Sequence, residues 1–488
     1  MNAKRMVGIL LALVMVLGMS LPAFAQGPIE PPLVHQEMKP GDSITVTKTV
    51  TTPVIPPNPD IYFLADTTGS MGGAIANVKA NAGAIMAAVM LAQPTAQFGV
   101  GNYKDFPYDS YAFQNQQNIT GNTADVQTAI NAWAAGGGAD GPEGWMYAMD
   151  RIANVGVGWR ANSTKIVVQF GDAPGHDPVP KVATGLGYDI TEATATAALV
   201  AADIHVIAVS LPTGGYANGL NDNPLLFGGN YASAYGIVEG GLPGQAGRIA
   251  AATNGAYLLA PTAADVAVKI LEGLHNLKTD VWGTVVADPG LSVTLVPPVH
   301  FGVASGTPVN FIETITITGT KCLKYYATVT FWGNTHPKEG AVIGTEKIEV
   351  GDFTPPKVWS VESVNPNGNN IPPAGSGTLP GPKGGMNEDG FYQELATDNC
   401  DKNPQIYISY VGSSNPKLFG PFDSGIVVKF TQAAPGRPAT IQKIGSTTGK
   451  AGAVAWHIIL PADASVIAID EAGNVSKPYV QLVPRPPK

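Results

Sequence analysis

The amino-acid sequence predicts an α/β doubly wound domain followed by two small all-β sandwich domains. From residue 58 to about 278, short apolar runs alternate with segments whose apolar residues recur at helical spacing. After residue 278 the helical spacing stops, and runs with alternating apolar residues take its place. The chain has 488 residues, enough for about three domains.

The α/β region is expected to contain a mostly parallel sheet. Strands are expected at 61–65, 97–103, 165–171 and 204–210, and helices at 73–91, 124–135, 143–154, 191–202 and 263–275. Strands that are separated by helices pair in parallel, and the helices then cover both faces of the sheet. This domain is expected to span residues 58–278.

The rest of the chain has the alternating pattern of half-buried strands. In residues 279–353 strands are expected at 291–297, 309–318, 325–332 and 345–350. The motif DFTPP at 352–356 ends this part, and a turn-rich loop covers 365–385. Within 354–488 further strands are expected at 405–411, 425–430, 455–460 and 464–470. We therefore expect two small β-sandwiches with a boundary near residue 353.

Residues 1–25 have the pattern of a secretory signal peptide. Lys4 and Arg5 precede an apolar run, and Ala23-Phe24-Ala25 provides small residues before a cleavage site after Ala25. No later apolar run reaches the length of about 18 residues that a spanning helix needs. The protein is therefore expected to be secreted and to have no membrane span after removal of the signal peptide.

Charge and composition narrow the class of partner. Removal of Lys4 and Arg5 leaves 26 basic against 37 acidic residues, a net charge of −11. A chain this acidic, without a basic block, is a poor ligand for nucleic acid or an anionic membrane. Abundant Thr, Asn, Gly and Pro are typical of extracellular β-rich modules with many turns.

Two cysteines, Cys322 and Cys400, lie in different expected β-domains. In a secreted protein they can form a disulfide between the domains. Two independent thiols are an equally good interpretation of the sequence, and both alternatives stay open.

Oxygen-bearing side chains follow two of the expected strands. Asp66, Thr68 and Ser70 come directly after the strand at 61–65, and Asp172 follows the strand at 165–171. In a doubly wound sheet, ligands bind beyond the carboxyl ends of the strands. Oxygen ligands without thiol or imidazole favour Mg²⁺, Mn²⁺ or Ca²⁺. An N-cap or Asx turn is the alternative interpretation of Asp66-x-Thr68-x-Ser70 taken alone.

Four motifs follow one another along the α/β region: DTTGSM at 66–71, FGVGNYKD at 98–105, DGPEG at 140–144 and Asp172-Ala173. In this order they resemble the von Willebrand factor type A family, and most closely the I-like domain of integrin beta chains. The first motif matches that family's metal-ion-dependent adhesion site (MIDAS), with Thr68 in place of a serine.

The resemblance implies a divalent cation, Mg²⁺ or Mn²⁺, with one position open for a carboxylate from a partner. Ser70, Thr68 and Glu143 would contact the ion directly, and Asp66 and Asp172 would hold it through water. Thr123 is the alternative to Glu143 if the site follows the more general family pattern.

The resemblance also implies a neighbouring Ca²⁺ site, formed by Asp105, Asp140, Glu143 and the carbonyl of Pro142. An asparagine of the family corresponds to Gly138 here, so one ligand is missing. A third family site requires acids where this chain has Gly72-Gly73. The segment after Asp105 is shorter than in integrins, so ligand identity is not carried over.

Other polar residues have plainer interpretations. His176 and Asp177 are expected to be solvated loop residues, with the rim of the metal site as the alternative. Residues 396–406 and 464–476 resemble bacterial immunoglobulin-like and hyalin-type repeats. There Asp398, Asp401 and Asp470 would bind Ca²⁺ or, more commonly, form turns.

These observations favour a non-enzymatic, secreted adhesion or ligand-binding protein. Its partner would be a protein or surface polymer that presents a carboxylate. The alternative is a structural component of an extracellular assembly that self-associates through the same metal site. A hydrolase is disfavoured because the sequence has no H-E-x-x-H or G-x-S-x-G motif.

The segment before the α/β domain has strand alternation, with Ile44, Val46 and Val50 on one face. A lone strand cannot satisfy its backbone groups or bury this face. By resemblance to integrin beta chains, we expect residues 30–56 to pair with 279–353 in one split β-domain. The alternatives are an edge strand on the α/β sheet or a flexible leader.

Overall fold

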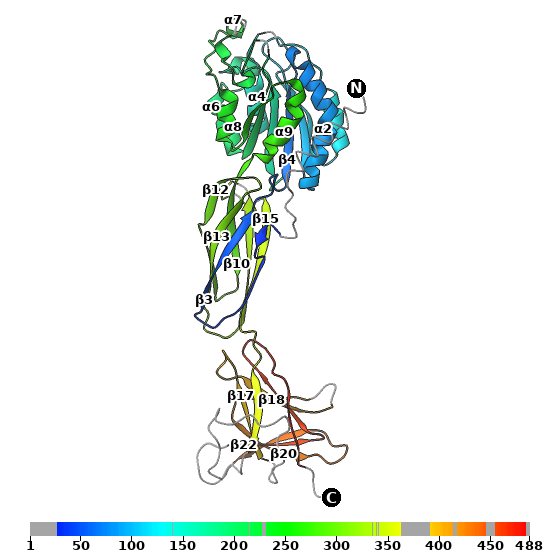
Figure 1. The fold of residues 1–488 in the computed structure, drawn as a ribbon, viewed down its shortest axis with the longest axis vertical. Helices are drawn as coiled ribbons and strands as arrows, with labels where there is room; N and C mark the ends of the chain where they lie inside the picture. The colour runs from blue at the N-terminus through cyan, green and yellow to red at the C-terminus, as the bar shows by residue number, and fades with distance from the viewer. Residues whose placement is uncertain are drawn as a thin grey trace.

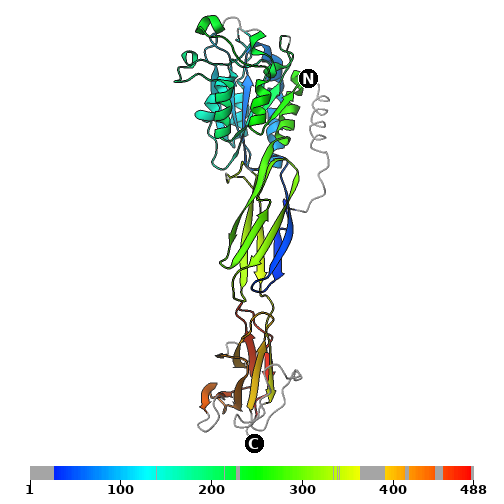
Figure 2. The same ribbon diagram turned by 90° about the vertical axis from the view of Figure 1, so that its left-hand side faces the viewer.

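The computed structural model describes residues 27–138, 140–213, 215–226, 231–333, 335–337, 339, 341–362, 391–412, 417–445 and 454–484. The chain forms an elongated molecule, with an α/β part at one end and two β-parts below it (Figure 1, Figure 2). We call these parts the head, the middle domain and the tail domain. The expected signal peptide and the whole loop at 365–385 lie outside the described residues.

The head contains a six-stranded sheet with the order β6-β5-β4-β7-β8-β9. All neighbouring pairs are parallel except β5 and β6, which are antiparallel. The central strands are buried along almost their whole length, as expected for a sheet covered on both faces. The strands are β4 (Pro59–Asp66), β5 (Gln97–Tyr103), β6 (Phe113–Thr120), β7 (Thr164–Gly171), β8 (Ile204–Ser210) and β9 (Ala256–Leu259).

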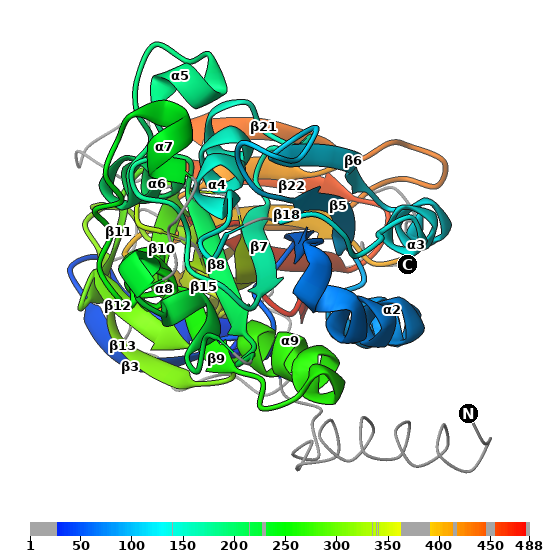
Figure 3. The ribbon, with the colours of Figure 1, turned by 90° about the horizontal axis from the view of Figure 1, so that it is seen from above.

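Helices cover both faces of this sheet (Figure 3). On one face α2 (Gly72–Ala92), α3 (Thr123–Asn131) and α9 (Val266–His275) share one hydrophobic core. The other face carries α4 (Trp145–Asn154), α6 (Glu192–Ala201) and α8 (Gln245–Ala252) around a second core. Short helices α5 (Lys181–Thr184) and α7 (Tyr231–Tyr235) lie in the loops, with 3-10 turns η1 (Gly69–Met71), η2 (Gly219–Asn221), η3 (Pro224–Leu226) and η4 (Ala263–Asp265).

The stretch Gly69–Ala92, which includes α2, is long and apolar enough to cross a membrane by length and composition alone. Its most apolar window is 44% buried, and Ile75, Val78 and Ile85 lie in the head core. A core helix passes the same test, so this is weak evidence for a span.

The sequence analysis missed β6, β9 and α8. The sequence of β6 is FQNQQNIT, a polar edge strand without apolar alternation, and β9 has only four residues. Neither has the periodic signal on which the predictions rest.

The middle domain is a sandwich of two sheets, ordered β1-β3-β13-β11 and β12-β10-β14-β15-β2. Its core contains Val50, Phe311, Val329, Phe331 and Ile348. The first sheet has β1 (Ile29–Glu30), β3 (Ser43–Thr51), β13 (Pro308–Ile317) and β11 (Leu291–Val296). The second has β12 (Val299–Ala304), β10 (Lys278–Ala287), β14 (Lys324–Gly333), β15 (Val342–Gly351) and β2 (Leu33–Glu37).

The segment before the head belongs to this sandwich. Strand β3 pairs antiparallel with β13 along its whole length, from Ser43 opposite Thr316 to Thr51 opposite Pro308. Strand β2 pairs in parallel with β15. The pairing expected from the split-domain hypothesis is therefore present, and an edge strand on the head sheet or a flexible leader is wrong. The head is joined to the middle domain by two connections.

The tail domain also has two sheets, β16-β17-β20-β22-β21 and β19-β18-β23-β24. The four strands expected from the sequence are present as β18, β20, β22 and β23, and the remaining five described strands were missed. The resemblance to immunoglobulin-like repeats stays a prediction. The strands are β16 (Lys357–Glu362), β17 (Phe391–Thr397), β18 (Gln405–Tyr410), β19 (Phe419–Phe422), β20 (Ile426–Gln432), β21 (Thr440–Gly445), β22 (Val454–Leu460), β23 (Ala464–Ile469) and β24 (Tyr479–Gln481).

A disulfide between Cys322 and Cys400 joins the middle and tail domains. The sequence left open whether these cysteines form a disulfide or stay independent thiols, and the structure contains the disulfide. Cys322 lies between β13 and β14, and Cys400 lies between β17 and β18.

A chain that begins at residue 57 tests the split domain. It lacks β1, β2 and β3, so the backbone groups of β13 and β15 that pair with β3 and β2 lose their partners. We expect amide exchange in β13 and β15 to accelerate by at least tenfold, while β4 and β7 in the head keep their protection. Unchanged protection of β13 would contradict the role of β3.

Candidate metal centre

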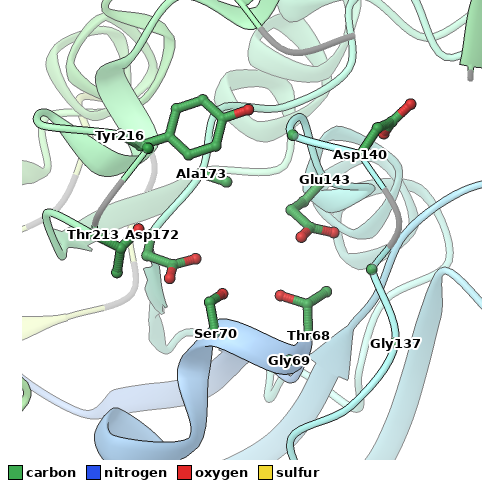
Figure 4. A pocket seen from close by; sticks show the side chains of 13 residues that line it. Thr68, Gly69, Ser70, Gly137, Asp140, Glu143, Asp172, Ala173, Thr213 and Tyr216 are labelled. Carbon is green, nitrogen blue, oxygen red and sulfur yellow. The ribbon is translucent and has the colours of Figure 1, made fainter. Parts of the chain in front are cut away.

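The loops at the carboxyl ends of β4 and β7 enclose a cavity of about 440 Å³ (Figure 4). Asp66 ends β4, and Asp172 directly follows β7. The side chains of Thr68, Ser70, Glu143 and Asp172 point into the same space. The lining residues are Thr68, Gly69, Ser70, Gly137, Gly138, Asp140, Gly141, Glu143, Asp172, Ala173, Thr213, Gly215 and Tyr216.

The first loop positions a hydroxyl against a carboxylate. Oδ1 of Asp66 accepts hydrogen bonds from the backbone N–H of Thr68 at 2.9 Å and from its hydroxyl at 2.7 Å. Because the hydroxyl donates its proton to Asp66, the lone pairs of Thr68 Oγ1 are left to face a cation. Asp66 and Thr68 are buried, whereas Ser70 is exposed at the mouth of the cavity.

The loop at 136–138 is tied to the first loop. The N–H of Gly69 donates to the carbonyl of Gly137 at 3.0 Å, and the N–H of Gly136 donates to Thr67 at 3.1 Å. Lys104 donates to the carbonyls of both Thr67 and Gly136. Gly138 has a φ of +73°, and a Cβ there would lie 3.0 Å from Thr68 Cβ. Glycine thus permits the close approach of the two loops.

Backbone hydrogen bonds also hold Glu143 against the loop after β7. The N–H of Glu143 donates to the carbonyl of Pro174 at 2.8 Å, and the N–H of His176 donates to the carbonyl of Glu143 at 3.1 Å. Thr123, the alternative ligand, begins α3 and does not line the cavity. The structure therefore places Glu143 with Asp66, Thr68, Ser70 and Asp172.

The buried carboxylates of this site lack a counter-charge. Burial, with the charge of Asp172 second, raises the pKa of Asp66 to about 7. Burial also raises the pKa of Glu143 well above its usual range, and the pKa of Asp172 is raised for the same reason. Asp66 Oδ2, Glu143 Oε2 and Asp172 Oδ2 have no hydrogen-bond partner among the described residues.

These residues fit a hard divalent cation. The side chains in the cavity offer carboxylate and hydroxyl oxygens, the ligands that Mg²⁺ and Mn²⁺ prefer. A bound cation would provide the positive charge that the three unpartnered carboxylate oxygens lack.

The expectation that His176 is a solvated loop residue is wrong. Its side chain is fully buried and stacks on the ring of Tyr231, with 3.7 Å between the centroids. Its Nε2 lies 2.9 Å from Asp105 Oδ1, and its Nδ1 lies 2.8 Å from Glu239 Oε2. Asp177 is half-buried, and its N–H donates to Glu239. Glu239 and Tyr231 are far away in the sequence, so the motif gave no sign of this contact.

His176 also changes the second metal site predicted from Asp105, Asp140, Pro142 and Glu143. Asp105 and Asp140 lie together with His176, with ligand atoms within 4.8 Å of one another. Burial lowers the pKa of His176, but hydrogen bonds and charges from Asp105 and Glu239 outweigh it and raise the pKa to about 9. In the metal-free protein a positively charged ring therefore lies against the two aspartates at neutral pH, and a second cation at this place would have to displace its proton.

Thr213 and Tyr216 also line the cavity, and sequence reasoning missed them. They follow β8 in a loop that has no recognisable metal motif.

A family model described as "Integrin beta-like protein A-E, vWA-like" matches residues 34–201. The chain contains a von Willebrand factor type A domain. The match includes the motifs at 66–71, 98–105 and 140–144, and Asp172.

One relative matches a smaller part of the chain. The alpha-protein kinase vwkA of Dictyostelium discoideum is 34% identical over 119 residues, which is 24% of this chain and 19% of that protein. The chain thus spans about a fifth of the length of that relative.

Two solved structures are similar at 12% identity. One is a von Willebrand factor type A protein from Catenulispora acidiphila, with a TM-score of 0.32 over 68% of this chain and 76% of that chain. The other is proximal thread matrix protein 1 from the mussel byssus, with a TM-score of 0.30 over 48% of this chain and 47% of that chain. Scores this low carry no further conclusion.

The raised pKa of Asp66 gives the metal-free type A domain a characteristic pH dependence. An Asp whose pKa is higher in the folded state stabilises the fold below its ordinary pKa of 3.8, and this contribution is lost as the pH rises to about 7. We expect Asp66→Asn to be more stable than the wild type at and above pH 7 in chelator, on the order of a few kcal/mol at about 1.4 kcal/mol per pKa unit.

Calorimetry of the full chain in chelator between about pH 4 and pH 7 measures this difference. In the Asp66→Asn variant the side-chain amide oxygen still accepts the N–H of Thr68, so the loop is preserved. A wild-type domain that is as stable as the variant at pH 7 would show that burial and the charge of Asp172 do not raise the pKa of Asp66.

Proposed function

We propose that this chain is a secreted adhesion or ligand-binding protein whose head binds an acidic group of its partner through Mg²⁺ or Mn²⁺. The observation that carries the proposal is a group of three buried carboxylates, each with one oxygen that lacks a hydrogen-bond partner among the described residues. Glu143 and Asp172 line an open cavity together with the hydroxyls of Thr68 and Ser70, and Asp66 accepts the hydroxyl of Thr68. The ligand class is a protein or surface polymer that presents a carboxylate. Secretion rests on the sequence pattern of residues 1–25.

Thr68, Ser70 and Glu143 are the residues proposed to hold the ion, with Asp66 and Asp172 behind them. Asp66 orients Thr68 through two hydrogen bonds. Ser70 is exposed, so a ligand can approach the ion from solvent. A divalent ion with an open position supplies positive charge for an anionic group of the partner.

A binding function fits the cavity better than catalysis. Among its described lining residues there is no cysteine, histidine or lysine, and two of its carboxylates, Glu143 and Asp172, are proposed to hold the ion. The word kinase in the name of the Dictyostelium relative describes a protein of which less than a fifth matches this chain.

Removal of either of two metal ligands tests the site. We expect Asp66→Ala and Ser70→Ala to lower Mg²⁺ affinity by at least a hundredfold. Ser70→Ala removes a hydroxyl that lines the cavity, and Asp66→Ala removes a carboxylate that orients the hydroxyl of Thr68. Isothermal titration with Mg²⁺ and Mn²⁺ measures the change, and Asp125→Asn, an exposed acid on α3, is the matched control. Undiminished affinity in both variants would refute the site assignment.

The partner class is tested with the same variants. Binding of the full chain to native surface material, with Mg²⁺ and with chelator, should require the ion and be lost in Ser70→Ala. Sedimentation at rising Mg²⁺ distinguishes an external partner from self-association. A chain that stays monomeric when loaded supports adhesion to another molecule, whereas Mg²⁺-dependent oligomers favour a structural assembly.

A further inference from the structure

Three charged side chains lie inside the core of the middle domain. Lys48 on β3, Glu313 on β13 and Glu346 on β15 all have fully buried side chains. Each occupies an inward position of its strand, where the neighbouring inward residues include Val50, Phe311 and Ile348. Lys48 and Glu313 belong to one sheet of the sandwich and Glu346 belongs to the other.

The three groups contact one another and little else. Lys48 Nζ lies against Glu346 Oε1, donates to the carbonyl of Pro31 at 2.5 Å, and lies 3.9 Å from Glu313 Oε2. Both carboxyl oxygens of Glu313 and the second oxygen of Glu346 have no hydrogen-bond partner among the described residues. The amine nitrogen of one sheet is therefore held next to the carboxyl group of the other.

An ion pair in this place is costly. Removing an ammonium or a carboxylate from water costs several kcal/mol per ion, and the apolar core offers few hydrogen bonds in return. Burial, followed by the charge of Glu346, raises the pKa of Glu313 to about 8, so this carboxyl group carries a proton at neutral pH. The site thus contains an amine, a carboxyl group and a neighbouring acid in a dry environment.

We propose that Lys48 and Glu346 condense into an intramolecular amide bond that joins β3 to β15, and that Glu313 moves the proton. The substrate is the folded chain itself. The product contains a neutral amide in place of two buried charges. The fold already holds the reacting groups next to each other, so the reaction does not require them to meet by diffusion.

The condensation releases one water molecule. The ammonium of Lys48 gives a proton to a carboxylate oxygen, and Nζ then forms a bond to Cδ of Glu346. Glu313 donates its proton to the departing oxygen and takes one from the nitrogen, so it ends unchanged. The bond from Cδ to one oxygen breaks, and this oxygen leaves as water with one proton from the ammonium and one from Glu313, which the nitrogen then returns to Glu313. No oxidant, nucleotide or metal is required.

Mass spectrometry of the wild-type full chain tests the bond without any variant. After reduction of the disulfide, the denatured chain should be lighter than its sequence by one water molecule. Protease fragments containing Lys48 and Glu346 should be recovered as one branched peptide. The exposed pair Lys321–Glu471, 3.2 Å apart, is an internal control that should yield separate peptides. Recovery of Lys48 with a free amine in the folded wild type would overturn the proposal.

Variants assign the role of Glu313. Glu313→Gln keeps the shape of the side chain but cannot move the proton, so we expect the branched peptide to fall at least tenfold. Lys48→Arg should abolish the branched peptide. Glu349→Gln changes a half-buried acid on the same strand as Glu346 and should leave the amount of branched peptide unchanged. Full cross-linking in Glu313→Gln would show that Glu313 is not the proton carrier.

A separate cluster lies between the middle and tail domains. Ligand oxygens of Asp352, Asp398 and Asp470 lie within 4.8 Å of one another. Asp352 is fully buried, and its Oδ2 has no hydrogen-bond partner in the described part of the chain; the same holds for Asp398 Oδ1. Burial, with the charges of Asp398 and Asp470, raises the pKa of Asp352 to about 7.

The geometry points to a Ca²⁺ site formed by Asp352, Asp398 and Asp470, with ligands from both domains. The sequence analysis named Asp401 with Asp398 and Asp470. Instead, the carboxylate of Asp401 accepts the N–H groups of Asn403 and Glu471. Asp352, which directly follows the last strand of the middle domain, takes the place of Asp401 in the cluster. Three carboxylates without a basic partner in the cluster suit Ca²⁺, which binds through oxygen ligands.

Calcium titration of the full chain tests this second site. The type A domain is kept saturated with Mg²⁺, and heat is measured for the wild type, Asp352→Asn and the matched control Asp401→Asn. We expect Asp352→Asn to lose one Ca²⁺-binding event that the wild type and Asp401→Asn retain. Equal numbers of bound Ca²⁺ in the wild type and Asp352→Asn would overturn the assignment.

Discussion

Burial of carboxylates without a positive partner is the constraint on which the head depends. Asp66, Glu143 and Asp172 lie beside one another in the type A domain, and burial raises the pKa of each. Lys104 in the same loops donates to the carbonyls of Thr67 and Gly136, so it holds the loops in place. The hydrogen bonds of the backbone thus hold three carboxylates close together although their charges repel one another. A bound cation would offset this repulsion.

Buried charge also marks the points where distant parts of the chain meet. Lys48 and Glu346 lie on strands at the two ends of the split domain, and the whole head lies between them in sequence. Asp352 and Asp470 meet where the middle and tail domains join. His176 meets Glu239 across the upper loops of the head. Lys48 and His176 each pair with a carboxylate at such a point, whereas Asp352 and Asp470 repel each other and would need a cation between them.

Sequence patterns predicted what local chemistry determines. The run 61–65 followed by Asp66, Thr68 and Ser70 was sufficient to predict the strand and the position of these side chains at its carboxyl end, because strand ends and hydroxyl spacing are local features. Burial of His176 was not predictable, since it depends on Tyr231 and Glu239. Lys48 gave a usable signal: the inward face of its strand reads Ile44, Val46, Lys48 and Val50, and a charge at such a position is exceptional.

The insertion of the head into the middle domain determines how the molecule would carry a mechanical load. The strands of the middle domain run along the long axis of the molecule (Figure 1). A pull from a ligand on the head, resisted at the tail, would act along β3 and β10. All the hydrogen bonds between β3 and β13, from Ser43 to Thr51, would then bear the force together in shear. They would not open one after another, as they would if the strands lay across the axis.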